Sequence, residues 1–426
     1  MNSNTFLLSF GIDPSNFVDV PNEPIKEDDG FTFYVEEKKD KVPCKYCSST
    51  NVYSKGSYLR TINVTDNSQI KKQIIVKKQR FYCRDCKRSF TLPIKGVEQG
   101  FRLSNFNKIQ LYNEYKEALT YSQIAKKFNI STARAINLFD ELHPTVKRLK
   151  MPRILCIDEI YFCKKRNHKY ICVISNFETG EIVDILESRL LSYLNDYFAN
   201  IPEKELKQVE YFISDMYDAY RTIKNRFMPK AKHVIDKFHI TLQLTNAINS
   251  LRIRAMNNCD EDSMERSFMK SKYELFLCKQ SDIPDSFYHQ KRTGRVEHFT
   301  DMVFDCIKKD QDFWDGYAIL QELLTYGRYR SFEDALKFIR RISNKLLTSN
   351  SDKLKQVGKT YTKWEIGIAE AHTYNMYNYN LSNALSEGNN NALSTLLKIF
   401  YGSRSYDRFR RRALLIFREN KGKKKK

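Results

Sequence analysis

The stretch that decides the fold is Arg153-Ile-Leu-Cys-Ile-Asp-Glu-Ile-Tyr161, an apolar and β-prone run that carries two carboxylates. An ionised aspartate in a buried strand is strongly destabilising unless a partner or a metal ion compensates its charge. Two further acidic residues stand in contexts that could complete a metal site. Asp215 ends the apolar run that begins at Val209, and Glu387 opens a polar helical segment. Because Mg²⁺ prefers carboxylate and water ligands, Asp158, Asp215 and Glu387 are candidate ligands of a magnesium site.

The elements around this stretch predict a mixed α/β domain. The expected strands are residues 153–162, 169–176, 181–187, 209–215 and 232–236, and the expected helices are 190–199, 217–227 and 238–256. This is the element order of a ribonuclease-H-like fold, in which the aspartates of the first and fourth strands lie side by side. Residues 257–375 are expected to form an all-helical insertion, after which residues 376–420 resume the catalytic domain.

The composition points to a polyanionic partner. The 426 residues carry a formal charge of +21, and lysine and arginine recur throughout the chain. Nucleic acid is therefore the expected partner, and an anionic membrane surface is the alternative. No apolar run approaches the roughly 18 residues of a membrane span, and the first residues lack the features of a secretory signal. We expect a soluble, cytoplasmic protein.

Two CxxC pairs predict a zinc ribbon in residues 41–95. Cys44 and Cys47 form the first pair, Cys83 and Cys86 form the second, and a strand-like stretch lies between them. Four thiolates in this spacing can bind one tetrahedral Zn²⁺ that replaces a core too small to stand alone. The alternative is two coincidental pairs in a reduced protein. The ribbon is also basic, so its cations either touch phosphates or form a solvated face: Lys71, Lys72, Lys77, Lys78, Arg80, Lys87 and Arg88.

Residues 100–150 predict a helix-turn-helix. Ile124 and Phe128 are spaced to bury one helical face, Asn129 suits a left-handed turn, and Ser131 can cap the second helix. That second helix would offer Thr132, Arg134 and Asn137 to a major groove, and Ser131 at its start is a further candidate DNA contact. An ordinary helical hairpin is the alternative.

The two ends of the chain differ in character. Residues 1–40 show little periodicity, and we assign them no chemistry. At the other end, Glu387, Asn391, Ser394 and Lys398 share one polar helix face, while Leu393, Leu396, Leu397 and Phe400 form the apolar side. The arginines of the C-terminal region (Arg404, Arg410 and Arg411) and the basic tail at 421–426, expected to be disordered, are predicted to bind phosphates.

Together these motifs resemble bacterial insertion-sequence transposases of the Asp-Asp-Glu type, most closely the ISL-three family. The motifs that carry the resemblance are the two CxxC pairs, Ile157-Asp158-Glu159, Asp215-Met-Tyr-Asp-Ala-Tyr220, Asp236-Lys-Phe-His239, and Glu387-Gly-Asn-Asn-Asn391 followed by Tyr401-Gly-Ser-Arg404. The resemblance implies that Asp158, Asp215 and Glu387 bind two Mg²⁺ or Mn²⁺ ions. It also implies that His239 lies near them, although a core or capping histidine is the alternative. Glu159 should point to the opposite face of its strand and take no ligand role.

The expected function is DNA transposition by a multidomain α+β protein. The ribbon and helix-turn-helix would bind the terminal inverted repeats of the element, and the carboxylates would cut the 3′ ends and join them to target DNA. Two ends must meet, so a homodimer on DNA is expected. The alternatives are a DNA-binding regulator or inactive relative that uses only the N-terminal modules, and a ribonuclease-H-like nuclease that cleaves without joining.

Overall fold

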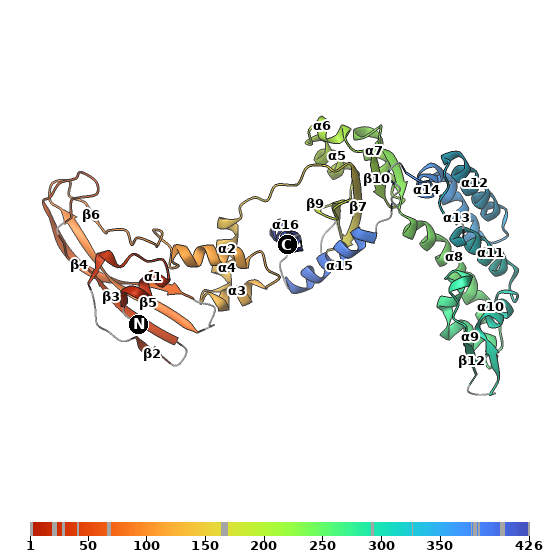
Figure 1. Cartoon of the computed structure of the whole chain (residues 1–426), viewed down its shortest axis with the longest axis horizontal. Coiled ribbons are helices and arrows are strands. Elements are labelled where there is room, and N and C mark those ends of the chain that lie inside the picture. The colour runs from red at the N-terminus through yellow and green to blue at the C-terminus, as the bar shows by residue number, and fades with distance from the viewer. Residues whose placement is uncertain are drawn as a thin grey trace. The chain divides into compact units, whose positions relative to one another are not determined.

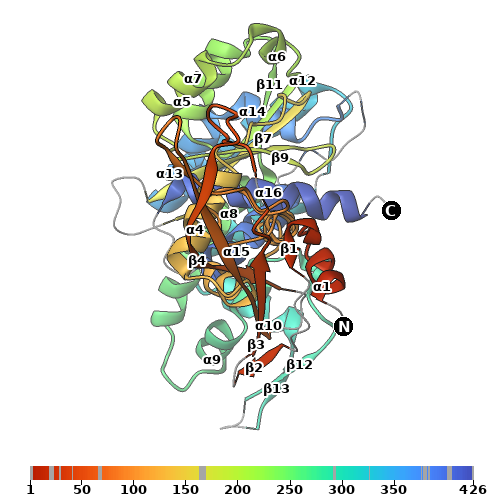
Figure 2. The same ribbon diagram turned by 90° about the vertical axis from the view of Figure 1, so that its left-hand side faces the viewer.

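The computed structural model divides the chain into two compact units, residues 1–147 with 395–426, and residues 148–394. It describes residues 3–18, 24–27, 30–40, 42–65, 70–162, 169–290, 294–325, 327–375, 377, 381, 384–400 and 405–424. For residues 3, 27, 71, 384–387 and 419–424 only the backbone is described. Figures 1 and 2 show the elements from two directions. The mixed α and β content predicted for the chain is confirmed.

The first unit is built on a sheet with a long antiparallel pair at its centre. β4 (Val52–Val64) pairs with β5 (Lys71–Cys83), and β5 pairs in parallel with β3 (Gly30–Glu37). Three short strands add to this sheet: β1 (Phe17–Val18), β2 (Ile25–Glu27) and β6 (Ser89–Phe90).

The N-terminal segment belongs to this core. Helix α1 (Ser3–Ser9) lies beside the sheet (Figures 1 and 2), and Phe6 stacks on Phe33 with ring centroids 3.4 Å apart. The buried core there joins Phe6 to Val35, Ile62 and Ile74. The view of residues 1–40 as an aperiodic segment is therefore wrong for β3, whose burial alternates along most of its length.

Three helices follow the sheet: α2 (Asn105–Glu114), α3 (Tyr121–Lys127) and α4 (Thr132–Leu142). Ile124 and Phe128 are buried as predicted, and Asn129 adopts a φ of 51° between α3 and α4. Ser131 Oγ accepts a hydrogen bond of 3.1 Å from the Arg134 amide, which caps α4. The C-terminal helix α16 (Tyr406–Lys424) packs in the same unit.

The second unit holds a five-stranded sheet in the order β11-β10-β7-β8-β9. Its strands are β7 (Ile154–Tyr161), β8 (Tyr170–Asn176), β9 (Ile182–Leu186), β10 (Tyr211–Ser214) and β11 (Lys232–Ile235). β7, β10 and β11 run parallel, whereas β8 and β9 are antiparallel to their neighbours.

Successive residues of β7 enter two different cores, as the two-residue period of a strand requires. Leu155 and Ile157 pack in one core with residues of three helices, α5 (Leu191–Ala199), α6 (Glu203–Lys207) and α7 (Asp218–Phe227). Ile154 and Cys156 face the other core, which is formed with α8 (Lys237–Asn257). Asp158 lies two residues after Cys156 and therefore on the same face of β7, the face toward α8.

The remaining helices of this unit extend the α8 core. They are α9 (Met264–Ser271), α10 (Phe299–Ile307), α11 (Gln311–Thr325), α12 (Phe332–Thr348), α13 (Asp352–Lys363) and α14 (Glu365–Ala371). The prediction of an all-helical insertion is wrong in one respect. β12 (Phe287–His289) pairs with β13 (Val296–His298), since the aromatic and β-branched residues of these short runs favour a hairpin.

Helix α14 lies close against β11. A Cβ on Gly367 would come within 2.8 Å of Ile235 Cγ1, so only glycine permits this approach. Helix α15 (Ala384–Ile399) then carries the polar segment predicted around Glu387. Its Leu393 and Leu396 are buried, as is Phe400 directly after it. Among the helices described, none is long and apolar enough to cross a membrane.

Candidate active site and cysteine cluster

Three aspartates lie level with one another in the sheet: Asp215 and Asp236 directly follow β10 and β11, and Asp158 lies within β7. Residues paired between β7 and β10 differ by 57 in residue number, as Cys156 and Ile213 do. The same difference places Asp158 opposite Asp215. The pairing of β10 with β11 keeps an offset of 21, as in Ser214 with Ile235, which places Asp215 opposite Asp236. The expected neighbourhood of Asp158 and Asp215 thus follows from the strand register.

The environment of these carboxyl groups opposes their ionisation. Burial raises the pKa of Asp215 to about 6, and the negative charges of Glu159 and Asp158 act in the same direction. Burial also raises the pKa of Asp158, although a 2.8 Å hydrogen bond from the Glu159 amide partly offsets it. Among the described residues, the buried Asp215 Oδ1 has no hydrogen-bond partner. A buried carboxylate oxygen without a donor fits a divalent cation.

Helix α15 reaches the site through consecutive asparagines. Asn390 Nδ2 donates a 2.7 Å hydrogen bond to Asp158 Oδ2, and Asn389 Nδ2 donates a 3.0 Å bond to the Gly180 carbonyl. Position 387 stands one helical turn before Asn390, on the same side of the helix. The Glu387 side chain lies outside the described residues. Asn390 was missed by the sequence reasoning, which grouped Asn391 with Glu387 by a four-residue step.

His239 lies on the first turn of α8, beside the carboxylates. Its Nε2 is 4.0 Å from Asp236 Oδ2, and its charge lowers the pKa of both Asp158 and Asp215 against the effect of burial. Asp236, which sequence reasoning left without a role, is 1% exposed at the same level of the sheet. A signal for it was present, since Asp236 ends a short apolar strand just as Asp215 does.

Glu159 contacts the opposite side of β7. Its carboxylate accepts hydrogen bonds of 2.7 Å from Arg189 Nη1 and 2.8 Å from the Tyr220 hydroxyl. Tyr220 is itself buried and lies 3.3 Å from the Cys172 sulfur. The Glu159 carboxylate is therefore held by a cation and a hydroxyl of the protein on that side of the strand.

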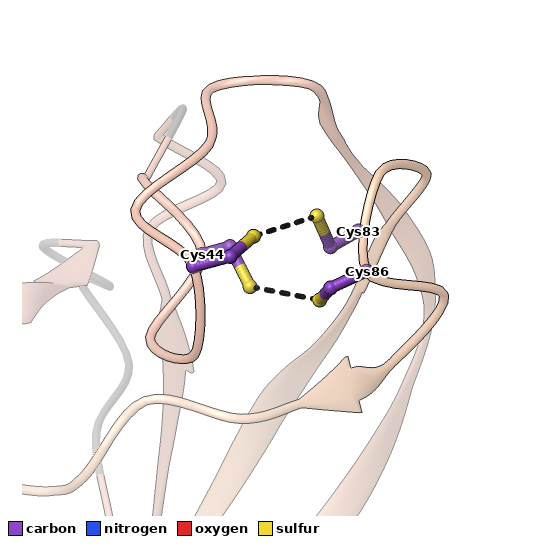
Figure 3. Close-up of side chains that lie close together, drawn as sticks. Cys44, Cys83 and Cys86 are labelled. Atoms are coloured by element: carbon purple, nitrogen blue, oxygen red, sulfur yellow. Dashed lines mark hydrogen bonds between the residues drawn. The ribbon is translucent and has the colours of Figure 1, made fainter.

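The four predicted zinc ligands converge in the first unit. The sulfurs of Cys44, Cys47, Cys83 and Cys86 all lie within 4.8 Å of one another, and both cross-pair distances (Cys44 to Cys86 and Cys47 to Cys83) are 3.6 Å. Figure 3 shows Cys83 and Cys86 on one side of the cluster, facing Cys44 on the other. Zn–S bonds of about 2.3 Å in a tetrahedron require sulfurs about 3.8 Å apart, so this cluster could hold zinc.

Local backbone geometry prepares this cluster. Ser48 and Lys87, which each follow a CxxC pair, have φ values of 57° and 56°. The Tyr46 amide lies 3.4 Å from Cys44 Sγ, as a donor to a thiolate would. Burial raises the pKa of Cys44, but this and other hydrogen bonds outweigh burial and lower it to about 7. A thiol with this pKa is readily deprotonated for metal binding.

The residues of α4 that were predicted to contact DNA differ in exposure. Ser131, Thr132 and Asn137 are exposed on α4. Arg134 is half-buried, pairs with Glu141 at 2.9 Å and lies over the Phe101 ring. Arg404 lies outside the described residues.

The C-terminal arginines Arg410 and Arg411 of α16 contact acceptors within the protein. Arg411 is 5% exposed and donates to Asp140, Asp407 and the His143 carbonyl. Arg410 is half-buried and donates to the Val146 carbonyl. These contacts hold α16 to α4 and to the segment that follows α4. The helix also continues to Lys424, so the expected disorder is wrong for residues 421–424, and residues 425 and 426 lie outside the description.

A comparison with protein families defines the class of the molecule. Residues 155–413 match a family model described as a transposase. The matched region spans more than half of the chain and begins in β7. The chain belongs to the ISL3 family of Asp-Asp-Glu transposases, which is the ISL-three family that its motifs resemble. A search of the curated proteins found no match.

Proposed function

We propose that this transposase binds the terminal inverted repeats of its insertion sequence and joins their 3′ ends to target DNA in a metal-dependent reaction. The observation that carries the proposal is the register that sets Asp158 of β7 opposite Asp215 after β10, where the pKa of Asp215 is raised and its Oδ1 has no hydrogen-bond partner among the described residues. The strand order and directions of residues 148–394 support a ribonuclease-H-like assignment for this unit.

Asp158, Asp215 and Glu387 are the proposed ligands of two Mg²⁺ or Mn²⁺ ions. When bound about 4 Å apart, such ions activate an attacking hydroxyl and stabilise a leaving oxygen. Each carboxylate comes from a different element, so the set can only form when α15 lies against β7. The hydrogen bond from Asn390 to Asp158 supports that arrangement, because it joins α15 directly to β7.

His239 and Asp236 would affect the electrostatics of the metal site without binding the metal ions. His239 offsets the mutual repulsion of the aspartates before cations bind, as its effect on their pKa values indicates. Asp236 lies 4.0 Å from the His239 imidazole and in register with Asp215. We assign both residues to positioning and not to the primary ligand set.

Recognition of DNA is assigned to the first unit. We propose that the cysteine cluster forms a zinc ribbon and that α3 and α4 form a helix-turn-helix, with Thr132 and Asn137 exposed toward a major groove. The exposure of these two side chains and the capped start of α4 support this assignment. Because joining requires two element ends, we further propose that a homodimer acts on the paired ends.

The test is joining of the element's own end, taken from the DNA beside its gene, to a target duplex. Wild type should join the end in Mg²⁺ or Mn²⁺ and fail in a chelator. Asp215→Asn should bind the end normally and join none. Binding with no joining by wild type in either metal would refute the proposed reaction.

A further inference from the structure

The outer halves of β4 and β5 form a two-stranded arm. β3 stops pairing with β5 at Lys77, whereas β4 continues to pair with β5 as far as Val52 and Cys83. We define the arm as residues 52–60 and 77–84. Gly56, with a φ of 98°, lies within the register shift between Ser54 and Ser57. The cysteine cluster closes the far end of the arm.

The two faces of the arm have different characters. One face packs Phe81 and Cys83 against Phe90 and Cys44 in a small apolar core. The opposite face carries three tyrosines and three cations, which we call the tyrosine–cation face: Tyr53, Lys55, Tyr58, Arg80, Tyr82 and Arg84. Each of these side chains is exposed or half-buried.

Aromatic rings hold the cations of this face in place. Tyr53 and Tyr82 are cross-strand partners with ring centroids 5.5 Å apart. Arg84 lies 5.1 Å from the Tyr53 centroid, and Lys55 lies 4.9 Å from that of Tyr82. Arg80 lies 5.6 Å from the Tyr58 centroid. Such pairs contribute about 0.5–1 kcal/mol each at exposed sites, enough to favour one orientation of a flexible side chain.

The three cations of this face lack a carboxylate partner among the described residues, unlike the buried Lys78 opposite Tyr58, which pairs with Glu37. Across the described part of the chain, Lys55, Arg80 and Arg84 form no ion pair with a carboxylate, whereas the neighbouring Lys77 pairs with Glu36 at 3.3 Å. Asp85 is the one acidic residue in 77–90, and it accepts hydrogen bonds from Ser49 and from Asn51. An ordered row of unpaired cations is complementary to a polyanion.

We propose that the tyrosine–cation face binds duplex DNA through its phosphates. Cations already cover the tyrosine rings, which disfavours base stacking and leaves the outer edges of the cationic groups to donate to phosphate oxygens. A two-stranded β-ribbon is also of a size that the major groove admits. This inference rests on the proposed function and specifies which surface of the first unit touches the element end.

The test measures binding of full-length protein, without divalent metal, to a duplex of the element end and to one of its single strands. Arg80→Ala with Arg84→Ala is the main variant, and Lys55→Glu is a second one that alters only an exposed position. Lys39→Ala with Lys95→Ala is the matched control, because both lysines are exposed in the same unit but pair with Glu36 and Asp13. Zinc content and unfolding temperature verify that each variant is folded.

The double arginine variant should bind the duplex at least tenfold more weakly. The slope of log K against log salt should fall by about 2, because each lost phosphate contact contributes about 0.9. Lys55→Glu should weaken duplex binding in the same direction, and the control should stay within twofold of wild type. Duplex affinity and salt slope equal to wild type would overturn the proposal, as would a loss confined to the single strand.

These outcomes are distinct from failure of the proposed function. If wild type and the double arginine variant bind and join the end equally well, only the role of the tyrosine–cation face is refuted. If wild type shows no preference for its end and no joining, the proposed function itself fails, and this inference falls with it.

Discussion

Asp158 on β7 and Asn390 on α15 are joined by a 2.7 Å hydrogen bond across 232 residues of sequence. This bond connects the central strand of the sheet to the helix that carries Glu387. It forms although the helical insertion separates the two segments in the chain. The site thus depends on a long-range contact and not only on the strand register.

Asn390→Ala should lower the joining rate about 10- to 100-fold, the range expected when the partner of a ligating group is removed. Binding of the element end should be unchanged, because the first unit is untouched. Asn391→Ala is the control, since Asn391 is the exposed neighbour on the same helix. Equal loss in both variants would show that α15 tolerates no change and that the Asp158 bond has no special role.

Asp215→Asn should stabilise the metal-free protein at pH 7.5 while it abolishes joining. A folded-state pKa of about 6 against 3.8 means that the ionised form destabilises the fold, by at most about 3 kcal/mol at 1.36 kcal/mol per pKa unit. The folded state binds the extra proton, so the destabilisation is present above pH 6 and disappears as the pH falls toward 4. Thermal unfolding should therefore show a gap between variant and wild type that narrows on acidification. A gap that widens at low pH would contradict the assigned environment.

Removal of one zinc ligand should unfold the end of the arm. Cys83→Ser should reduce bound zinc from one ion per chain to a small fraction and weaken end binding, because a structural zinc replaces the missing core. Metal analysis of purified protein measures the first effect. Cys259→Ser, a half-buried cysteine of the second unit, should retain full zinc content. Retained zinc in Cys83→Ser would place the ion elsewhere.

Arg412→Ala should destabilise the first unit by about 2–4 kcal/mol, because it leaves buried carbonyls without a donor. The Arg412 side chain is 1% exposed, donates to the Leu119 carbonyl, and lies 4.6 Å from the Tyr121 centroid. Arg411→Ala should have a similar effect through lost contacts with Asp140. The measurement is the unfolding temperature beside the salt dependence of DNA binding. A changed salt slope with unchanged unfolding would return Arg411 to the DNA-contacting residues.

Local sequence patterns predicted most helices and strands of the second unit. They also predicted that Asp158 and Asp215 lie side by side. Strands such as Tyr211–Ser214 are continuous apolar runs, and a following aspartate marks the edge of the sheet. Asp236 obeys the same pattern and could have been included. Asn390 could not, because the choice between neighbouring asparagines depends on how α15 lies against β7.

Long-range pairing explains the other misses. The parallel contact of β3 with β5 joins residues about 40 apart, and nothing in the 1–40 segment specifies its partner. The C-terminal arginines were assigned to DNA because a charge cluster usually faces solvent. The spacing of Phe409, Arg412, Ala413 and Ile416 places Arg412 within an apolar stripe, which was the available signal for a buried guanidinium.

The most direct test of the central claim is end joining in Mg²⁺ by Asp158→Asn, Asp215→Asn and Glu387→Gln, with Glu181→Gln as the control from the β8–β9 hairpin. If the three carboxylates form one metal site, each of their variants should join at least about 1,000-fold more slowly while end binding stays within twofold, and the control should match wild type. Joining by Glu387→Gln at the wild-type rate would contradict the proposed triad and would move the third ligand to another residue, with Asp236 the first to be tested.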